Sequence, residues 1–289
     1  MANRALVVAL AILMQLSFNT ATEANINDAV ASENIHNINN EITIDEQNSF
    51  IISITDLDDL TAKDDTTNYN SNELSNNEIV SEYIRENNPL KPMVALTYDD
   101  GPSKYTEELL DVLKDNNSAA TFFVLGSQVS KYEETIIRMI EEGNQVGNHS
   151  YDHKRLTLLN DEDLYNQINK TDNLIYDIAY YNPFVIRPPY GSTNKELLIK
   201  LQRPIINWSI DTRDWESRNT GSIIESILQN VKDGDIILMH DLYETTIEAS
   251  KLVIPELINR GYQLVTVSEL SEHKDIILKA GQSYYNLYK

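Results

Sequence analysis

The feature that most constrains the fold is an alternation, from Lys91 onward, between short apolar segments and amphipathic segments with a helical period. Six segments rich in β-branched and aromatic residues are predicted to be strands: Met93–Tyr98, Ala120–Leu125, Phe184–Ile186, Ile205–Ile210, Asp235–Met239 and Gln263–Val267. Helices are predicted between them at Tyr105–Lys114, Lys131–Glu142, Leu164–Ala179, Ser222–Val231 and Thr245–Arg260. This alternation is typical of an α/β fold with parallel strands, either a (β/α) barrel or an open, doubly wound sheet.

Five polar clusters follow predicted strands, and in such folds the chemistry gathers at the carboxyl ends of the strands. The first cluster, TYDDGP at 97–102, contains the adjacent carboxylates Asp99 and Asp100. Repulsion between them would raise the pKa of one carboxyl unless a cation or an arginine lies nearby. The Gly-Pro pair forces a turn directly afterwards, so both side chains can point into a strand-end cleft. Taken alone, this sequence would be interpreted as a solvated turn.

The second cluster, HSYDH at 149–153, follows a further short predicted strand at Gln145–Gly147 and is suited to bind a metal ion. His149 and His153 are spaced i and i+4, which places both on one face of a helical turn, within reach of one ion at about 2.0–2.1 Å. A pair of surface histidines is the alternative interpretation. Together with Asp100, the two imidazoles would form a facial site that leaves positions open for water and substrate. Zinc, cobalt and nickel would all accept these ligands.

The third cluster, RPPYG at 187–191, combines a cation with a rigid turn. Arg187 can hold a carboxylate in its ionised form through a bidentate contact. The two prolines fix the direction of the backbone and Gly191 permits an unusual dihedral, so the amide of Tyr190 could be presented as an oxyanion donor. Without the other clusters, this segment would pass as an ordinary turn.

The last two clusters, DTRDW at 211–215 and LMHD at 238–241, provide acid–base groups and an apolar wall. His240 is a candidate general acid, and Asp214 could orient it and favour its protonated form. Trp215 and Leu238 would line a pocket for a small substituent. A solvated acid and a histidine at the edge of the core are the ordinary alternatives. The recurrence of such clusters after five strands favours a single functional face.

The first 90 residues differ from the rest in composition. A short positive region, an apolar run and small residues near Ala21 and Ala24 predict that 1–24 is a signal peptide or, if retained, a membrane anchor. Either interpretation places the remainder outside the cytoplasm, secreted or associated with the cell wall or membrane. The segment 25–90 is acidic, rich in Asn and free of Gly, so we interpret it as a largely disordered spacer in which 49–54 has strand propensity.

Charge and cysteine content exclude several classes of function. The chain carries 45 acidic and 23 basic side chains among 289 residues, a net charge of −22. A field of that sign repels a polyanion and therefore argues against binding to nucleic acid through phosphate neutralisation. The absence of cysteine excludes disulfides, thiolate zinc sites, iron–sulfur clusters and thiol nucleophiles. No feature of the sequence indicates an oligomeric state.

The five clusters, in their order and approximate spacing, resemble those of the polysaccharide deacetylase (NodB-homology) family, the fourth carbohydrate esterase family. The resemblance covers a catalytic domain at 91–270, with 271–289 as a C-terminal extension. It implies a distorted (β/α) barrel with fewer than eight strands, and a divalent metal that serves the hydrolysis of N- or O-acetyl groups on sugars. One departure is Tyr98, where the family commonly has Phe, and its side chain is expected to face away from the metal.

The resemblance also implies a role for each residue. Asp99 would be the general base, and Arg187 would position it. The metal ligands would be Asp100, His149 and His153. The remaining groups would be His240 as general acid with Asp214 beside it, the Tyr190 backbone at the oxyanion, and Trp215 and Leu238 around the acetyl group.

The function that we predict is removal of N-acetyl groups from an N-acetylglucosamine polymer, peptidoglycan or chitin-like, with zinc as the expected metal and cobalt or nickel as alternatives. An O-acetyl esterase acting on acetylated xylan is a second possibility, because the same site suits the easier ester. A carbohydrate-binding protein that has lost turnover is a third. The five clusters contain every catalytic residue type, which argues against a protein that has lost turnover.

Overall fold

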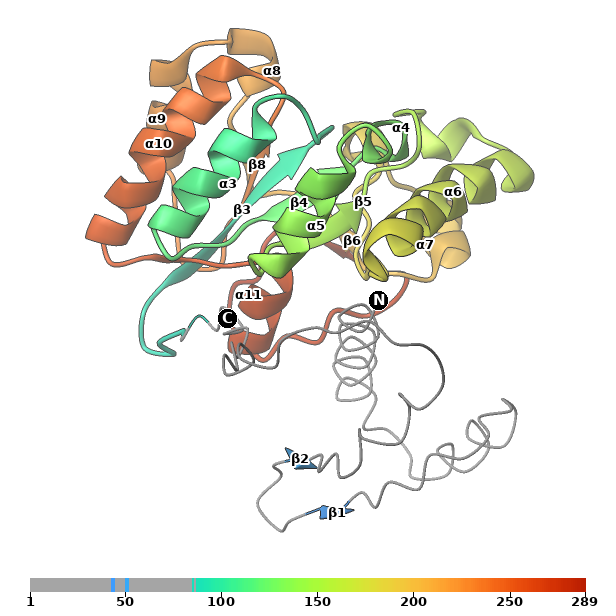
Figure 1. Ribbon diagram of the computed structural model, residues 1–289, viewed down its shortest axis with the longest axis horizontal. Coiled ribbons are helices and arrows are strands. Elements are labelled where there is room, and N and C mark those ends of the chain that lie inside the picture. Colours follow the sequence, from blue (N-terminus) through green and yellow to red (C-terminus); the bar gives the residue numbers. More distant parts are fainter. Residues whose placement is uncertain (1–42, 45–49, 52–84, 86) are drawn as a thin grey trace, which may run out of the picture. The chain divides into compact units, whose positions relative to one another are not determined.

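The computed structural model describes residues 43–44, 50–51, 85 and 87–289 (Figure 1). By its internal contacts the chain divides into two compact units, Met1–Val80 and Ser81–Lys289.

Little of the first unit is described. In it, β1 (Thr43–Ile44) pairs antiparallel with β2 (Phe50–Ile51), which falls within the run of strand propensity. The predicted signal or anchor segment and most of the predicted spacer lie outside the described residues. Among the helices that are described, none combines the length and the apolar character that crossing a membrane requires.

The centre of the second unit is a parallel sheet. Its strands are β3 (Met93–Asp99), β4 (Thr121–Val124), β5 (Gln145–Asn148), β7 (Ile210–Asp211), β8 (Ile236–His240) and β9 (Gln263–Leu264). Their order is β5-β4-β3-β8-β7, with β9 also paired to β3, and every one of these pairings is parallel. The predicted α/β class with parallel strands is confirmed.

Further pairings continue the sheet beyond β5. Ile186 bridges Asn148 at the end of β5 to β6 (Ile205–Ile206). β6 in turn pairs with β10 (Ser283–Tyr284), and a bridge from Asn286 reaches Asp235, directly before β8. The succession of pairings therefore leads from β8 through β3, β4, β5 and β6 to the C-terminal segment and back to the start of β8.

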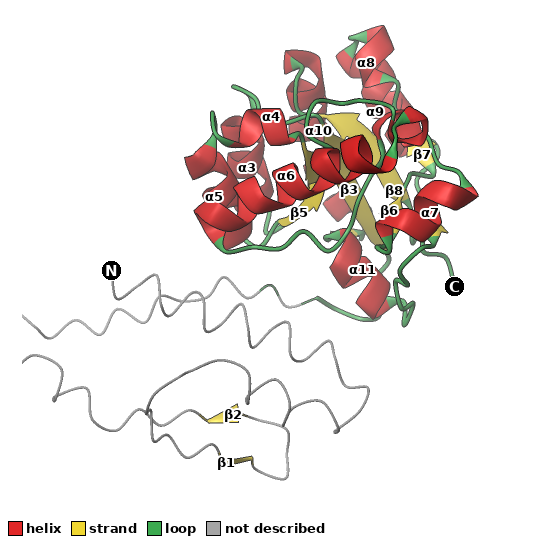
Figure 2. Cartoon of the chain, turned by 90° about the vertical axis from the view of Figure 1, so that its right-hand side faces the viewer, coloured by secondary structure: helices red, strands yellow, loops and turns green. Residues whose placement is uncertain are grey.

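Helices surround the strands (Figure 2). They are α3 (Thr106–Asp115), α4 (Gly126–Val129), α5 (Glu133–Glu141), α6 (Asp161–Ala179), α7 (Lys195–Leu201), α8 (Asp214–Ser217), α9 (Thr220–Leu228), α10 (Glu244–Asn259) and α11 (Val267–His273), with 3₁₀ turns at Leu156–Leu158 and Pro189–Gly191. The five predicted helices correspond to α3, α5, α6, α9 and α10 within a few residues at each end. The shorter α4, α7, α8 and α11 were not predicted.

Two of the buried clusters lie on opposite faces of the sheet, because successive side chains of a strand point to opposite sides. Val94 and Leu96 of β3 belong to a cluster that includes the buried leucines of α3 and residues of α10. Met93 and Ala95 belong to another, which includes Leu270 of α11 and the C-terminal Leu287. By the same alternation Thr97 and Asp99 share the face of Met93 and Ala95, so the strand that forms the core also positions its last carboxylate.

Three predicted strands differ from those observed. Phe184–Ile186 contributes a single bridge at Ile186. Ile205–Ile210 is divided into β6 and β7, because these two ends have different partners, β10 and β8. Gln263–Val267 is cut short at Leu264, since Thr266 caps α11: its side chain accepts from the amide of Glu269, and the Glu269 carboxylate accepts from the amide of Thr266.

Candidate functional site

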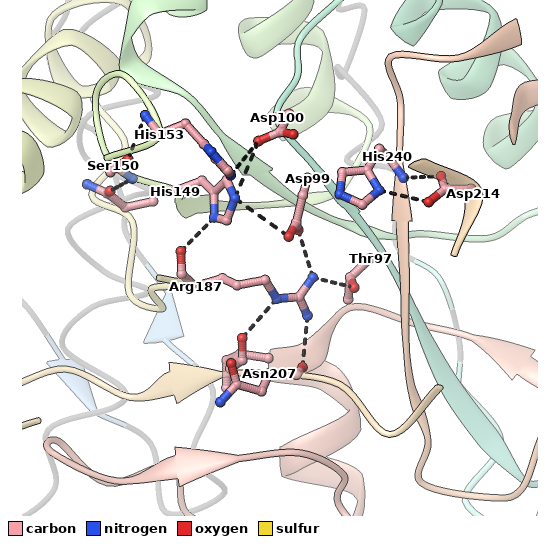
Figure 3. Close-up of polar contacts among 12 residues, drawn as sticks. Thr97, Asp99, Asp100, His149, Ser150, His153, Arg187, Asn207, Asp214 and His240 are labelled. Atoms are coloured by element: carbon pink, nitrogen blue, oxygen red, sulfur yellow. Dashed lines mark hydrogen bonds and ion pairs between the residues drawn. The ribbon is translucent and has the colours of Figure 1, made fainter. Parts of the chain in front are cut away.

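The predicted site residues come from different strands but meet at one end of the sheet. Asp99 and His240 end β3 and β8 and are direct neighbours in the parallel register. His149 follows β5, Arg187 follows the bridge at Ile186, and Asp214 begins α8 shortly after β7. Figure 3 shows these side chains gathered around Asp99.

Asp100, His149 and His153 form a cluster with the geometry of a metal site. Asp100 Oδ1 lies 3.4 Å from the Nε2 atom of His149 and 3.4 Å from that of His153, and the three ligand atoms lie within 4.8 Å of one another (Figure 3). A tetrahedral ion with bonds of about 2.1 Å separates its ligand atoms by about 3.4 Å. Asp100 Oδ1 is buried and accepts no hydrogen bond from any described residue, so the donor set fits a divalent cation.

The environment of His149 leaves its Nε2 atom with a free lone pair. The ring is 2% exposed, and Nδ1 lies 2.6 Å from the carbonyl oxygen of Arg187. Because a carbonyl can only accept, Nδ1 carries the proton and Nε2 offers its lone pair toward Asp100. Burial lowers the pKa of His149 to about 3 against the opposing charge of Asp100, which keeps the imidazole neutral, the form that binds metals.

The prediction of a helical turn at 149–153 was wrong, although its two imidazoles do converge, with ring centroids 5.1 Å apart. The segment is an irregular loop in which Ser150 and His153 have φ of 70° and 63°. A right-handed helix excludes positive φ. The loop is held instead by the Asn148 carboxamide, which accepts from the Ser150 amide, and by Ser150 Oγ, which accepts from the His153 amide.

Arg187 is a buried cation that fixes Asp99. Its side chain is fully buried, and Nη1 donates to Asp99 Oδ1 at 2.7 Å. The contact is not the predicted bidentate one, because the other donors of the guanidinium are used on Thr97 Oγ1 and on the carbonyl oxygens of Ile206 and Asn207. The second oxygen of Asp99 is therefore left facing His149, 3.7 Å from its Nε2 atom.

The pKa of Asp99 is raised by burial and is held back by the charge of Arg187. Burial disfavours the carboxylate, whereas the neighbouring guanidinium favours it. A raised pKa makes the ionised group a stronger proton acceptor than an exposed aspartate, and the charge of Arg187 favours that ionised form.

His240 is held by Asp214. Nδ1 of the ring lies 2.8 Å from Asp214 Oδ1, and the backbone amide of His240 donates to Oδ2 at 2.7 Å. Burial of the ring lowers the pKa of His240, but the hydrogen bond and charge of Asp214 outweigh it and raise the pKa to about 9. Figure 3 shows the other ring nitrogen on the side that faces Asp99. The imidazole of His240 is therefore protonated near pH 7.

The remaining predicted residues border this centre. Tyr190 has φ of 64°, and its ring packs edge-on against His153 with centroids 4.6 Å apart. The backbone of Trp215 donates to Asp214 Oδ1, and its side chain is 46% exposed. Leu238 is buried in β8, opposite Thr97 of β3.

Comparison with known proteins identifies the family. The family model for polysaccharide deacetylases matches residues 86–203. A peptidoglycan-N-acetylglucosamine deacetylase of Bacillus cereus is 36% identical over 188 residues, which cover 62% of this chain and 68% of that protein. The chain belongs to the polysaccharide deacetylase family. The resemblance found in the five sequence clusters is confirmed.

Other members of the polysaccharide deacetylase family are similar in sequence and structure. Peptidoglycan-N-acetylmuramic acid deacetylase PdaC of Bacillus subtilis is 46% identical over 187 residues, covering 64% of this chain. The chain spans about two fifths (40%) of the length of that relative. The solved PdaC structure has a TM-score of 0.64 and covers 65% of this chain and 94% of its own. A family 4 acetyl xylan esterase from Clostridium thermocellum, in complex with a cobalt ion, has a TM-score of 0.64 at 31% identity, covering 67% and 98%.

Two hydroxyl groups that were not assigned a role from the sequence also form hydrogen bonds to residues of the site. Thr97 Oγ1 accepts from Arg187 and donates to the carbonyl of Ile237. Thr246 Oγ1 donates to Asp214 Oδ2 at 2.8 Å. Strand alternation could have identified Thr97, since it lies two residues before Asp99. Thr246 belongs to α10, and no sequence signal connects it to Asp214.

Asp241 is a third residue that was not assigned a role from the sequence, and it forms hydrogen bonds to the segment that follows β3. Its carboxylate is fully buried and accepts a hydrogen bond from Thr106, while its carbonyl accepts from Ser103. Burial raises the pKa of Asp241 to about 7. The backbone at Gly101 passes so close that a Cβ there would lie 2.3 Å from both carboxylate oxygens.

Replacing Gly101 with alanine is expected to lower the free energy of unfolding by about 1–3 kcal/mol, because the added methyl group overpacks against Asp241. The strain falls on the loop that carries Asp99 and Asp100, so metal affinity should fall as well. Chemical denaturation and metal titration measure the two effects. Gly221→Ala in α9 is the control, since its Cβ would meet only Asn219 Oδ1, at 3.3 Å. Equal stability of the two variants would contradict the close approach.

Proposed function

We propose that the chain hydrolyses N-acetyl groups of an N-acetylglucosamine-containing polysaccharide, with peptidoglycan favoured over chitin-like polymers, and releases acetate. The observation that carries the proposal is the pairing of a three-ligand cluster, Asp100, His149 and His153, with Asp99 and His240 at the ends of neighbouring strands. The names of the B. subtilis and B. cereus relatives support peptidoglycan as the substrate. The predicted export and the domain at 91–270, a distorted barrel, are part of the proposal.

A divalent cation, zinc or alternatively cobalt or nickel, would be held by Asp100, His149 and His153. When bound there, it would polarise the acetamide carbonyl and lower the pKa of water. Neutral His149 and the otherwise unpartnered Oδ1 of Asp100 support this ligand set. The other residues of the site would transfer protons or hold the substrate in place.

Asp99 takes a proton from the attacking water, whose oxygen forms a bond to the acetyl carbon. The backbone amide of Tyr190 donates to the carbonyl oxygen as negative charge develops on it. His240, protonated on the nitrogen that faces Asp99, then gives its proton to the sugar nitrogen as the carbon–nitrogen bond breaks. The products are acetate and a free amino sugar. Trp215 and Leu238 would enclose the methyl group.

This assignment predicts two limbs in the pH profile. Activity should fall as the pH decreases through the raised pKa of Asp99, and it should fall as the pH increases through the pKa of His240, about 9. Asp214→Asn removes the charge that raises the pKa of His240, so the alkaline limb of kcat should move down by about one to two pH units. A pH profile measured at fixed metal concentration tests this. An alkaline limb at the same pH in Asp214→Asn would show that Asp214 does not raise the pKa of the general acid.

An O-acetyl esterase acting on xylan is a second candidate, supported by the structural similarity to the C. thermocellum acetyl xylan esterase. An ester has a better leaving group than an amide and depends less on His240 as an acid. Acetate release should therefore be measured from peptidoglycan, N-acetylchitooligosaccharides and acetylxylan, each with and without a chelator. Chelator-sensitive release from peptidoglycan is expected to exceed release from acetylxylan. The reverse order would favour the esterase, and binding of glycan without any release would favour a non-catalytic protein.

A further inference from the structure

Two arginines beside the site have no acidic partner within the part of the chain that the structure describes. The described residues include eight arginines, and six of them pair with carboxylates: Arg85, Arg138, Arg187, Arg203, Arg213 and Arg260. Arg155 and Arg218 form no ion pair with any described residue. Carboxylates are abundant, since the chain has 45 acidic side chains against 23 basic ones. The absence of an ion pair at Arg155 and Arg218 within the described residues therefore has to be explained by their immediate surroundings.

Arg155 lies on the metal-ligand side of the site. Its guanidinium carbon is 4.8 Å from the ring centroid of Tyr190, and Nη1 donates to Ser192 Oγ at 3.3 Å. The Tyr190 ring in turn packs against His153. Arg155 and Tyr190 are both exposed, the latter by 59%. One guanidinium is thus held next to a proposed metal ligand with further N–H donors open to solvent.

Arg218 lies on the side of the proposed acid. Its guanidinium carbon is 3.2 Å from the ring centroid of Tyr243, and Nε donates to the carbonyl of Trp215 at 2.9 Å. The Tyr243 ring lies 6.1 Å from that of His240. The two arginine–tyrosine stacks therefore flank the catalytic groups, one beside His153 and the other beside His240.

A stacked guanidinium is suited to bind a carboxylate. Contact with an aromatic face limits its side-chain freedom, and its planar donors match the two oxygens of a carboxylate. A neutral sugar offers no such partner. In peptidoglycan, carboxylates are carried by the stem peptide and, on muramic acid residues that bear no stem peptide, by the lactyl ether, next to the N-acetyl groups of the glycan.

We propose that Arg155 and Arg218 bind carboxylate groups of the glycan on the two sides of the acetyl group to be removed, so that the site selects an acidic polysaccharide over a neutral one. The inference rests on the proposed function for its substrate, but it concerns binding and can be tested without turnover.

The test measures binding to the full chain with Asp99→Asn, in the presence of zinc, so that bound glycan persists. The ligands are a tetrasaccharide of alternating N-acetylglucosamine and N-acetylmuramic acid, its lactyl methyl ester, the same glycan with stem peptides, and chitotetraose. By calorimetry, the free acid should bind at least about tenfold more tightly than its methyl ester. Adding Arg155→Met and Arg218→Met should remove most of that difference, and higher salt should reduce it.

The matched control is Arg260→Met, which replaces an exposed arginine paired with Glu256 on α10 and should leave the preference unchanged. A preference for the free lactyl acid identifies the lactyl group as the source, whereas a preference only for the peptide-bearing glycan identifies the stem peptide. Equal affinity for all four ligands, or a preference that survives both substitutions, would overturn the inference. Acetate release by the unsubstituted chain is measured separately; it tests the proposed function and has no bearing on the binding preference.

Discussion

Asp99→Asn is expected to lower kcat for acetate release about a thousandfold, within the range for loss of a general base. The amide cannot accept the proton of the attacking water, yet it keeps nearly the same shape. Asp99 is 3% exposed, and its Oδ1 atom accepts from Arg187, so the substituted side chain stays in place. Metal affinity should change little, because the proposed ligands are Asp100 and the two histidines.

The measurement combines steady-state kinetics, metal titration and thermal unfolding of the same preparation. Loss of the buried ion pair with Arg187 will lower stability, so activity is compared at a temperature where the variant is fully folded. Asp152→Asn is the matched control: it lies in the same loop as the histidines, but its carboxylate pairs with Lys154 at the surface. An Asp99→Asn protein with activity near that of the control would refute the assignment of the base.

Asp100→Ala is expected to abolish activity at limiting metal by removing the one anionic ligand. Two neutral imidazoles alone should bind a divalent ion at least about a hundredfold more weakly than the complete set. Asp100 is partly exposed and His153 more so, so His153→Ala offers a second variant whose fold is little affected. Circular dichroism checks that both remain folded.

Chelation provides the same test without mutation. Activity of the unsubstituted chain should disappear after dialysis against a chelator and return on addition of zinc, cobalt or nickel. Full activity in the metal-free protein, or normal metal affinity in Asp100→Ala, would contradict the proposed ligand set.

Much of the site could be predicted from sequence because a parallel fold brings the ends of its strands together. The clusters around Asp99, His149, Arg187 and His240 each follow a predicted strand, and these ends do meet. Strand alternation also accounts for Tyr98, which faces away from Asp99 and contacts Ser250 of α10. These features follow from local periodicity.

What the sequence did not reveal depends on contacts that local periodicity does not encode. The loop at His149 is set by Asn148 and Ser150 through hydrogen bonds that permit positive φ, whereas the i, i+4 spacing suggested a helix. The donors of Arg187 are divided among Asp99, Thr97 and two backbone carbonyls that only the folded chain places nearby. Similarly, β10 pairs with β6 across some eighty residues of sequence, and β10, with two residues, is too short to be recognised from its sequence alone.

The most direct test of the account is a titration of the metal-free full chain with Co²⁺, followed by its visible absorption. The account predicts one ion per chain with the intense bands of a four- or five-coordinate cobalt site bearing nitrogen and oxygen ligands. Those bands should persist in Asp99→Asn and be lost in Asp100→Ala and His153→Ala. A spectrum that vanishes with Asp99→Asn but survives both ligand substitutions would show that the cation is held elsewhere.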